Sequence, residues 1–179
     1  TGMGDALNAV KGLRGGSVYF NNLQPVTMYD FAATADSANA RALLGAIYAN
    51  SGNGGTPTRE TLKYIGEQYR TNTGIIQYGC QRNAAFILTD GFANASSVTV
   101  PAYAQATWVG TRPYQSIYAG SLADLASSYY TNNLRPDLLT GLLNVDPSDT
   151  SPSADKNPDL HMNTFGVTLG LTGTIYGTS

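Results

Sequence analysis

The segment Asn83–Asn94, NAAFILTDGFAN, decides the fold of this chain. Apolar residues run without interruption from Ala84 to Leu88, and the chain then turns through Thr89–Gly91. Because the run does not alternate between apolar and polar residues, it predicts a central parallel strand that is covered on both faces. The carboxylate of Asp90 is therefore expected at the end of the most buried strand of the protein.

Helical and strand patterns alternate along the rest of the sequence. Spacing, caps and glycine stops predict helices over Gly2–Leu13, from Asp36 or Ser37 to Tyr48, over Thr56–Arg70 and over Ser121–Tyr130. Thr56 is a candidate N-cap before Pro57, and Ser121 and Asp124 have the spacing of a capping box. Strand patterns are predicted for Ser17–Phe20 and Phe165–Leu171. Leu23–Phe31 is ambiguous, with an edge strand after Pro25 as one interpretation, and Val98–Tyr103 is typical of a weak strand or a loop.

This alternation predicts an α/β fold: a doubly wound, mostly parallel sheet with helices on both faces. With 179 residues, the chain is expected to form a single domain over residues 1–179. Residues 134–160 form a long Pro- and Asp-rich segment without periodicity, which is expected to be a loop. In doubly wound sheets, ligands bind beyond the carboxyl ends of the strands, which is where Asp90 is expected.

The composition excludes several classes of function. Hydrophobic residues make up 42% of the chain and charged residues only 12%, a polar but uncharged surface that is common in secreted and cell-surface proteins. A net charge of −2 without a Lys/Arg cluster argues against a nucleic-acid partner. No apolar run approaches the roughly 20 residues of a membrane span, and no signal peptide is recognised.

Thr56 and Asp90 suggest a cation site. Oxygen ligands that come from separate loops at one edge of a sheet suit a hard divalent cation, Mg²⁺ or Ca²⁺. The arrangement resembles the metal site of the von Willebrand factor A domain, which combines a D-x-S-x-S run, a Thr from a second loop and an Asp from a third. Here GGTP resembles the Thr segment and LTDG resembles the Asp segment.

Four longer segments, in order, narrow this resemblance: GGTPTRETLKYIGEQYR, CQRNAAFILTDGFAN, SLADLASSYYTNNLRPDL and HMNTFGVTLGL. Together they resemble the A-like domain of the PilY family, large proteins associated with type IV pilus assembly and the pilus tip, over roughly Asp36–Leu171. The resemblance implies an extracellular protein at the pilus tip of a bacterium, which supports pilus extension and adhesion. Its implied partners are pilus subunits or a receptor protein on a host or surface.

The chain departs from the family pattern at its beginning. The first strand and its D-x-S-x-S loop are expected before Met3, and the sequence does not contain them there. DTSPS, with Asp149, Ser151 and Ser153, fits the pattern literally, but no apolar strand leads into it, and an ordinary loop is the preferred interpretation. We therefore expect a sheet that lacks its first strand in this chain, completed by strand donation from another chain or an upstream segment. In the alternative interpretation, the chain is a structural assembly subunit that binds no metal.

Other polar residues have simpler interpretations. The sequence has no G-x-S-x-G and no H-E-x-x-H motif, so we do not expect an enzyme. His161, the sole histidine, is expected to be a hydrogen-bonded residue at the start of a strand. The loop aspartates are expected to be solvated; they are Asp146, Asp149, Asp155 and Asp159. Cys80 has no partner for an internal disulfide and is either a thiol that pairs outside this chain or a small buried residue.

Overall fold

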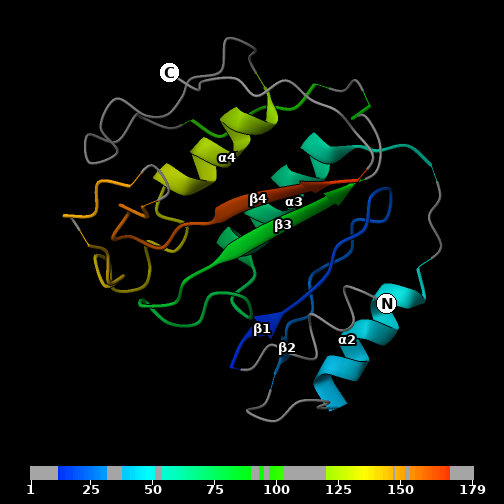
Figure 1. Ribbon diagram of the computed structural model, residues 1–179, viewed down its shortest axis with the longest axis horizontal. Coiled ribbons are helices and arrows are strands. Elements are labelled where there is room, and N and C mark those ends of the chain that lie inside the picture. Colours follow the sequence, from blue (N-terminus) through cyan, green and yellow to red (C-terminus); the bar gives the residue numbers. More distant parts are fainter. Residues whose placement is uncertain are drawn as a thin grey trace.

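The computed structural model describes residues 12–31, 38–50, 54–89, 93–94, 97–102, 120–146, 148–151 and 154–169 (Figure 1). Its elements, in chain order, are β1 (Arg14–Gly15), β2 (Tyr29–Asp30), α2 (Ala38–Tyr48), α3 (Thr58–Thr71), β3 (Ala84–Thr89), α4 (Leu122–Thr131) and β4 (Asn163–Thr168). The fold is mixed α/β, with a small parallel sheet at its centre. None of the helices in the described part is long and apolar enough to cross a membrane.

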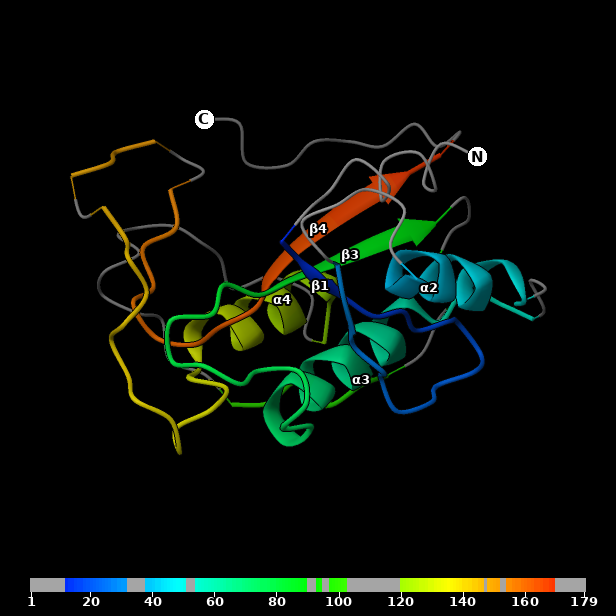
Figure 2. The same ribbon diagram turned by 90° about the horizontal axis from the view of Figure 1, so that it is seen from below.

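The parallel sheet consists of β3 and β4, which pair from Ala84 with Asn163 to Thr89 with Thr168. Helices α3 and α4 contact each other and lie on one side of these two strands (Figure 2). The predicted parallel strand is thus confirmed. Helices on both faces are not seen in the described part, because α2 packs instead on the short antiparallel pair of β1 and β2.

The faces of β3 differ sharply in exposure. Ala85 is buried, whereas Phe86 is 69% exposed and Leu88 is 47% exposed. Phe86 stacks on Phe165 of β4, with ring centroids 5.0 Å apart. The prediction that this strand is covered on both faces is therefore wrong for Phe86 and Leu88. Since successive side chains of a strand point to opposite faces, an unbroken apolar run identifies the strand without establishing what covers each face.

The main core lies between the sheet and the two helices. Tyr129 of α4 is buried against Gly66 of α3, where a Cβ atom would come within 3.0 Å of the tyrosine ring. The tyrosine hydroxyl donates to the backbone oxygen of Lys63 at 3.1 Å and contacts Glu67 Oε1 at 3.0 Å. The buried apolar members of this core are Leu62, Ile75, Ile76, Ala85, Leu125, Tyr129, Leu134, Leu160 and Met162.

The helix predictions hold with small changes at the ends. The capping box of α4 is confirmed, since Asp124 N–H donates to Ser121 Oγ at 3.1 Å and Ser121 N–H donates to Asp124 Oδ2 at 3.2 Å. Helix α3 begins at Thr58 with Pro57 as its cap residue, and it has no side-chain cap. Thr56 as N-cap is therefore wrong. Of the predicted helix over Gly2–Leu13, only Gly12 and Leu13 are described, and neither is helical. The cap of α2 at Asp36 or Ser37 lies outside the described residues.

The other predicted strands are absent or displaced. Ser17–Phe20 is not a strand; only Tyr19 forms a bridge, with Asn22, and the pairing that exists joins β1 to β2. Val98–Tyr103 has no strand in its described residues, 98–102, and β4 begins two residues earlier than the predicted Phe165. Residues 134–160 have no helix or strand in their described part, as predicted.

Candidate functional site

Thr56 lies just before α3, in a turn that is fixed through its backbone. Its N–H donates to Asn94 Oδ1 at 2.7 Å, and its carbonyl oxygen accepts from Asn94 N–H at 3.0 Å and from Thr58 N–H at 2.9 Å. The Thr56 hydroxyl has no hydrogen bond within the described part of the chain. This hydroxyl does not cap α3, because Pro57 and not Thr56 is the cap residue of the helix.

Asp90 and its two successors lie outside the described residues. The ends of the segment around them are placed: Thr89 closes β3, and its carbonyl oxygen accepts from Leu169 N–H at 3.0 Å. Asn94, four residues after Asp90, bonds to Thr56. The first turn of α3 lies at the end of the molecule where the arrows of β3 and β4 finish (Figure 1). The structure therefore brings the Thr56 turn to the chain that follows β3.

The two predicted ligands are of the chemical kind that suits a hard cation. A hydroxyl oxygen from Thr56 and a carboxylate from Asp90 are ligands that Mg²⁺ and Ca²⁺ accept, and the Thr56 hydroxyl is not committed to another described group. Among the described residues, no group of three His, Cys, Asp or Glu side chains could hold a metal ion.

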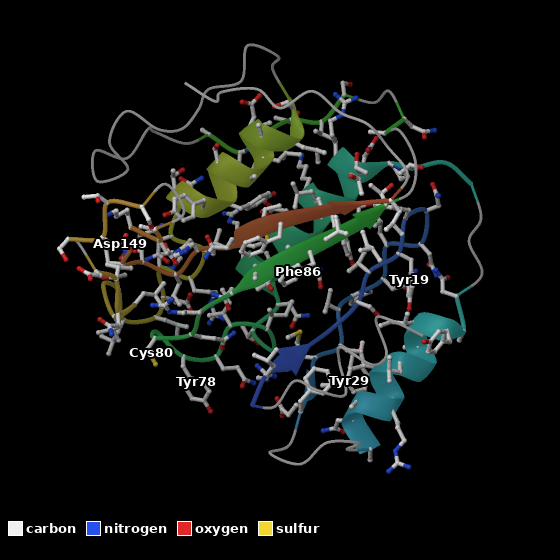
Figure 3. All side chains as sticks on the ribbon, in the orientation of Figure 1. Tyr19, Tyr29, Tyr78, Cys80, Phe86 and Asp149 are labelled. Atoms are coloured by element: carbon white, nitrogen blue, oxygen red, sulfur yellow. The ribbon has the colours of Figure 1, made fainter. Side chains whose placement is uncertain are left out.

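Asp149 and Ser151 lie elsewhere. Asp149 Oδ1 accepts from Ser151 N–H at 2.8 Å, and this backbone donor lowers the pKa of the Asp149 carboxyl. Asp149 lies on the opposite side of the molecule from Tyr19 (Figure 3). Asn21, two residues after Tyr19, donates to Gly55 O at 2.6 Å, so Tyr19 lies on the same side of the molecule as Thr56. The structure does not bring Asp149 and Ser151 to Thr56, and Ser153 lies outside the described residues.

Asp155 and His161 form a polar cluster at the start of β4. His161 is 2% exposed; its Nδ1 lies 2.7 Å from Asp159 O, and its Nε2 lies 3.1 Å from Asp155 Oδ2. Burial raises the pKa of the Asp155 carboxyl, but the hydrogen bond and charge of His161 and the N–H donors of Asn157 and Asn163 outweigh burial and lower it to about 2. The interpretation of His161 as a hydrogen-bonded residue is confirmed, whereas that of Asp155 as a solvated loop residue is wrong.

Cys80 lies in the loop before β3, and its side chain is exposed. The neighbouring Tyr78 is 66% exposed, and both side chains project from the same loop (Figure 3). The interpretation of Cys80 as a small buried residue is therefore wrong. A partner for its thiol outside this chain stays a prediction.

Sequence reasoning missed Asn94, which holds Thr56, and Asp155, which holds His161. An asparagine in a loop carries no periodic or capping signal, so nothing in the sequence marked Asn94. Asp155 stands six residues before His161, and this spacing belongs to no recognised motif. The contacts of both residues depend on how separate loops meet in the folded chain.

Comparison with known proteins gives one relationship. No family model matches this chain, and no solved structure matches it. The chain is similar to the type IV pilus biogenesis factor PilY1 of Pseudomonas aeruginosa (strain UCBPP-PA14), with 31% identity over 149 residues. The match covers 69% of this chain and 13% of PilY1, so the chain spans a small part of the length of that relative. The resemblance of this sequence to a PilY protein is thus confirmed at the level of sequence similarity.

Proposed function

We propose that this chain is a von Willebrand factor A-like domain of a type IV pilus protein, which binds a partner through a divalent cation held by Thr56 and Asp90. The observation that carries the proposal is the pair of hydrogen bonds that the Thr56 backbone makes with Asn94, one to its side-chain Oδ1 and one from its backbone N–H. This pair brings the Thr56 turn to the segment after β3. The similarity to PilY1, named as a pilus biogenesis factor, supports the pilus setting.

The mechanism is binding rather than catalysis. The Asp90 carboxylate supplies charge, and the neutral Thr56 hydroxyl supplies an oxygen without further charge, so the bound cation keeps an attraction for an acidic group of the partner. The partner is a pilus subunit or a surface receptor protein, and the location is extracellular, at the pilus tip. Burial of His161, at 2% exposure, supports the absence of catalysis, because a buried imidazole has no access to a substrate.

A thermal melt tests the cation site. The wild-type chain is heated with chelator and then with millimolar Mg²⁺, Mn²⁺ or Ca²⁺, beside the variants Asp90→Ala and Thr56→Val. A ligand at 100 times its dissociation constant stabilises the folded state by about 2.7 kcal/mol, which raises Tm by several degrees. We expect this rise in the wild-type chain and not in Asp90→Ala. No rise with any of the three cations contradicts the proposal.

A second candidate function is favoured by the exposed side of the sheet. The Asn163 N–H donates to Asn83 O, so the backbone of Asn83 faces the β4 side. In a parallel strand the backbone groups of alternate residues face the same neighbour, so those of Ala85 and Ile87 also face β4. The backbone groups of Phe86 and Leu88 are therefore directed to the outer edge of β3. Parallel sheets are normally covered on both faces, yet Phe86, Leu88 and Phe165 are exposed. These features support a structural assembly subunit whose sheet is completed by a strand from another chain or an upstream segment, without metal.

Sedimentation equilibrium separates the two functions. A subunit that accepts a strand from another copy self-associates with concentration in the presence of chelator, and Phe86→Ser weakens the association. A cation-dependent binder stays monomeric under the same conditions and gains stability on addition of metal. Stability that is independent of metal, in a chain that self-associates, favours the second candidate over the first.

A further inference from the structure

A buried histidine lies against a carboxylate where the long loop meets the start of β4. The His161 side chain is buried, and Asp155 reaches it from the loop with a side chain that is only part-buried. Tyr130 of α4 closes the cluster, since its ring meets the imidazole edge-on. A buried polar group needs a hydrogen-bond partner in each protonation state that it adopts, so the neighbours of His161 show which states this site can hold.

One ring proton of His161 is fixed by the backbone. Nδ1 lies 2.7 Å from the carbonyl oxygen of Asp159, which can only accept a hydrogen bond. Nδ1 therefore carries a proton whether the ring is neutral or charged. The other ring nitrogen, Nε2, is the atom at which the protonation of His161 changes.

Nε2 has one partner for each of its two states. Asp155 Oδ2 lies 3.1 Å away and, as a carboxylate oxygen, can only accept, whereas Asn163 Nδ2 lies 3.2 Å away and can only donate. A protonated Nε2 donates to Asp155, and an unprotonated Nε2 accepts from Asn163. The Asn163 amide also lies 3.3 Å from Asp155 Oδ2, so it donates to the carboxylate while the ring is charged. The cluster thus provides both hydrogen-bonding patterns.

Asp155 is the ionised side chain that faces the ring. Burial raises its pKa, but the hydrogen bond and charge of His161 outweigh burial and lower the pKa to about 2, so Asp155 stays charged where a histidine titrates. Burial raises the pKa of Tyr130, whose neutral hydroxyl donates to Asp155 Oδ1 at 3.2 Å. The other charged side chains on the adjoining segments have partners away from the ring: Lys156 Nζ bonds to Asp149 O, Asp159 Oδ1 to Gly141 N–H and Arg82 to Asn144 O.

The position of Asp155 also affects the rest of the long loop. Asp155 Oδ1 accepts the Asn157 N–H at 3.2 Å, which fixes the turn that begins residues 155–160. These residues in turn hold an earlier part of the loop, because Pro158 O accepts the Leu143 N–H at 3.1 Å. The contacts run in series from Asp155, so a movement of this carboxylate is passed on to the loop.

We propose that His161 and Asp155 form a pH-sensitive latch, which holds the long loop to the start of β4 while Nε2 is protonated and releases the loop when that proton is lost to water. After the loss, Nε2 accepts from Asn163, and its lone pair faces the acceptor oxygen of Asp155. Two acceptors at this distance repel each other, so the carboxylate moves toward water and gives up its hold on the loop. The latch is a two-state element that a single histidine biases, and it depends on no cation.

The first measurement is the protonation of the ring in the wild-type chain. His161 is the sole histidine of the sequence, so its ring signals need no assignment among several residues. Nitrogen NMR of the ring reports each nitrogen separately and is recorded from about pH 5 to pH 9. We expect Nδ1 to stay protonated throughout and Nε2 to lose its proton as the pH rises. A ring that keeps one charge state over this range, or that loses the Nδ1 proton instead, overturns the latch.

Amide hydrogen exchange of the same chain measures release of the loop. Protection of the Asn157 and Leu143 N–H groups, corrected for the intrinsic rate at each pH, is expected to fall at least about tenfold as Nε2 loses its proton. The Phe31 N–H, bonded to Leu13 O at 2.8 Å, is the internal control and is expected to keep its protection. Unchanged protection at Asn157 or at Leu143 overturns the proposal. An equal loss at Phe31 also overturns it, because the whole domain then opens rather than the loop.

Variants separate the latch from a general effect on stability. Asp155→Asn keeps the size and an acceptor oxygen but not the charge, and His161→Gln keeps hydrogen-bonding groups that do not titrate. Protection of the Asn157 N–H is expected to be independent of pH in both variants. Asp146→Asn is the matched control and is expected to keep the wild-type profile, because Asp146 bonds to Ser148 in the exposed part of the loop. A wild-type profile in Asp155→Asn overturns the latch. If a variant does not fold, the two measurements on the wild-type chain decide the question.

Discussion

Asp155 Oδ2 lies 3.1 Å from His161 Nε2, and this contact joins the long loop to the start of β4. The His161 side chain is 2% exposed and that of Asp155 is 19% exposed. Tyr130 of α4 contributes its hydroxyl, 3.2 Å from Asp155 Oδ1, and its ring meets the imidazole edge-on at 4.8 Å. The three side chains come from the long loop, from the residues just before β4 and from a helix, so they tie the loop to the main core.

Replacement of Asp155 by asparagine is expected to destabilise the protein. The amide keeps the size of the carboxylate but loses the charge that faces His161, and removal of a charged partner from a part-buried hydrogen bond costs about 1 to 3 kcal/mol. Urea unfolding at neutral pH measures the loss. Asp146→Asn is the control, because Asp146 bonds only locally to Ser148 in the exposed part of the loop, and little change is expected there.

Acid is expected to remove the contribution of Asp155. Its pKa is lowered from the ordinary value near 4 to about 2 in the folded protein, so the folded state binds its proton less readily than the unfolded state does. The stabilisation is fully present above about pH 4 and is lost as pH falls through about 2, and it amounts to roughly 1 to 2 kcal/mol after allowance for solvent screening. The stability difference between wild type and Asp155→Asn should shrink correspondingly between pH 5 and pH 2, and a constant difference contradicts this assignment.

Gly66→Ala is expected to destabilise the contact between α3 and α4. The added methyl group would come within 3.0 Å of the Tyr129 ring, which is buried and bonded through its hydroxyl, so the helices must separate at a cost of about 1 to 3 kcal/mol. Gly45→Ala in α2 is the matched control, because its Cβ meets no atom within 4 Å. This second change should stabilise its helix by up to about 1 kcal/mol. Thermal melts of the two variants should therefore shift in opposite directions.

Serine at Phe86 and Phe165 is expected to cost little stability in the isolated chain. Phe86 is 69% exposed and Phe165 is 49% exposed, so most of their surface is already in contact with water, and the loss is mainly their mutual stacking of about 1 kcal/mol. The double variant should also be more soluble, because a contiguous apolar patch is removed. Chemical unfolding and light scattering measure both effects. A large loss of stability would mean that another part of this chain covers the two rings.

The helices were the most predictable part of the fold. The capping box of Ser121 and Asp124 is local, and the buried face of α3, with Leu62 and Gly66, follows from spacing alone. The strand at Ala84 was equally clear, and its parallel partner was predicted within two residues. These features depend on interactions between residues that are close together in the sequence, so they can be predicted from it.

Contacts between distant segments were not predictable. Arg14 pairs with Asp30 through two-residue strands and through an ion pair between the two side chains. No periodic pattern in the sequence predicts this pairing. The exposure of Phe86 depends on which elements cover the sheet. For the site, Thr56 was found because its segment resembles a motif, but its hydrogen bonds with Asn94 form only when two separate loops meet in the folded chain. The placement of Asp90 stays a prediction.

The pairing of β3 with β4 has a consequence for the order of folding. Ala84 pairs with Asn163, so β3 leaves the ribosome long before its partner does. Helix α3 can pack on Ala85 early, but the sheet can close only when nearly the whole chain is available, because parallel pairing brings together segments that are far apart in sequence. During that interval an apolar strand with free backbone groups is open to wrong partners. The domain is therefore exposed to self-association until β4 has been synthesised and has paired with β3.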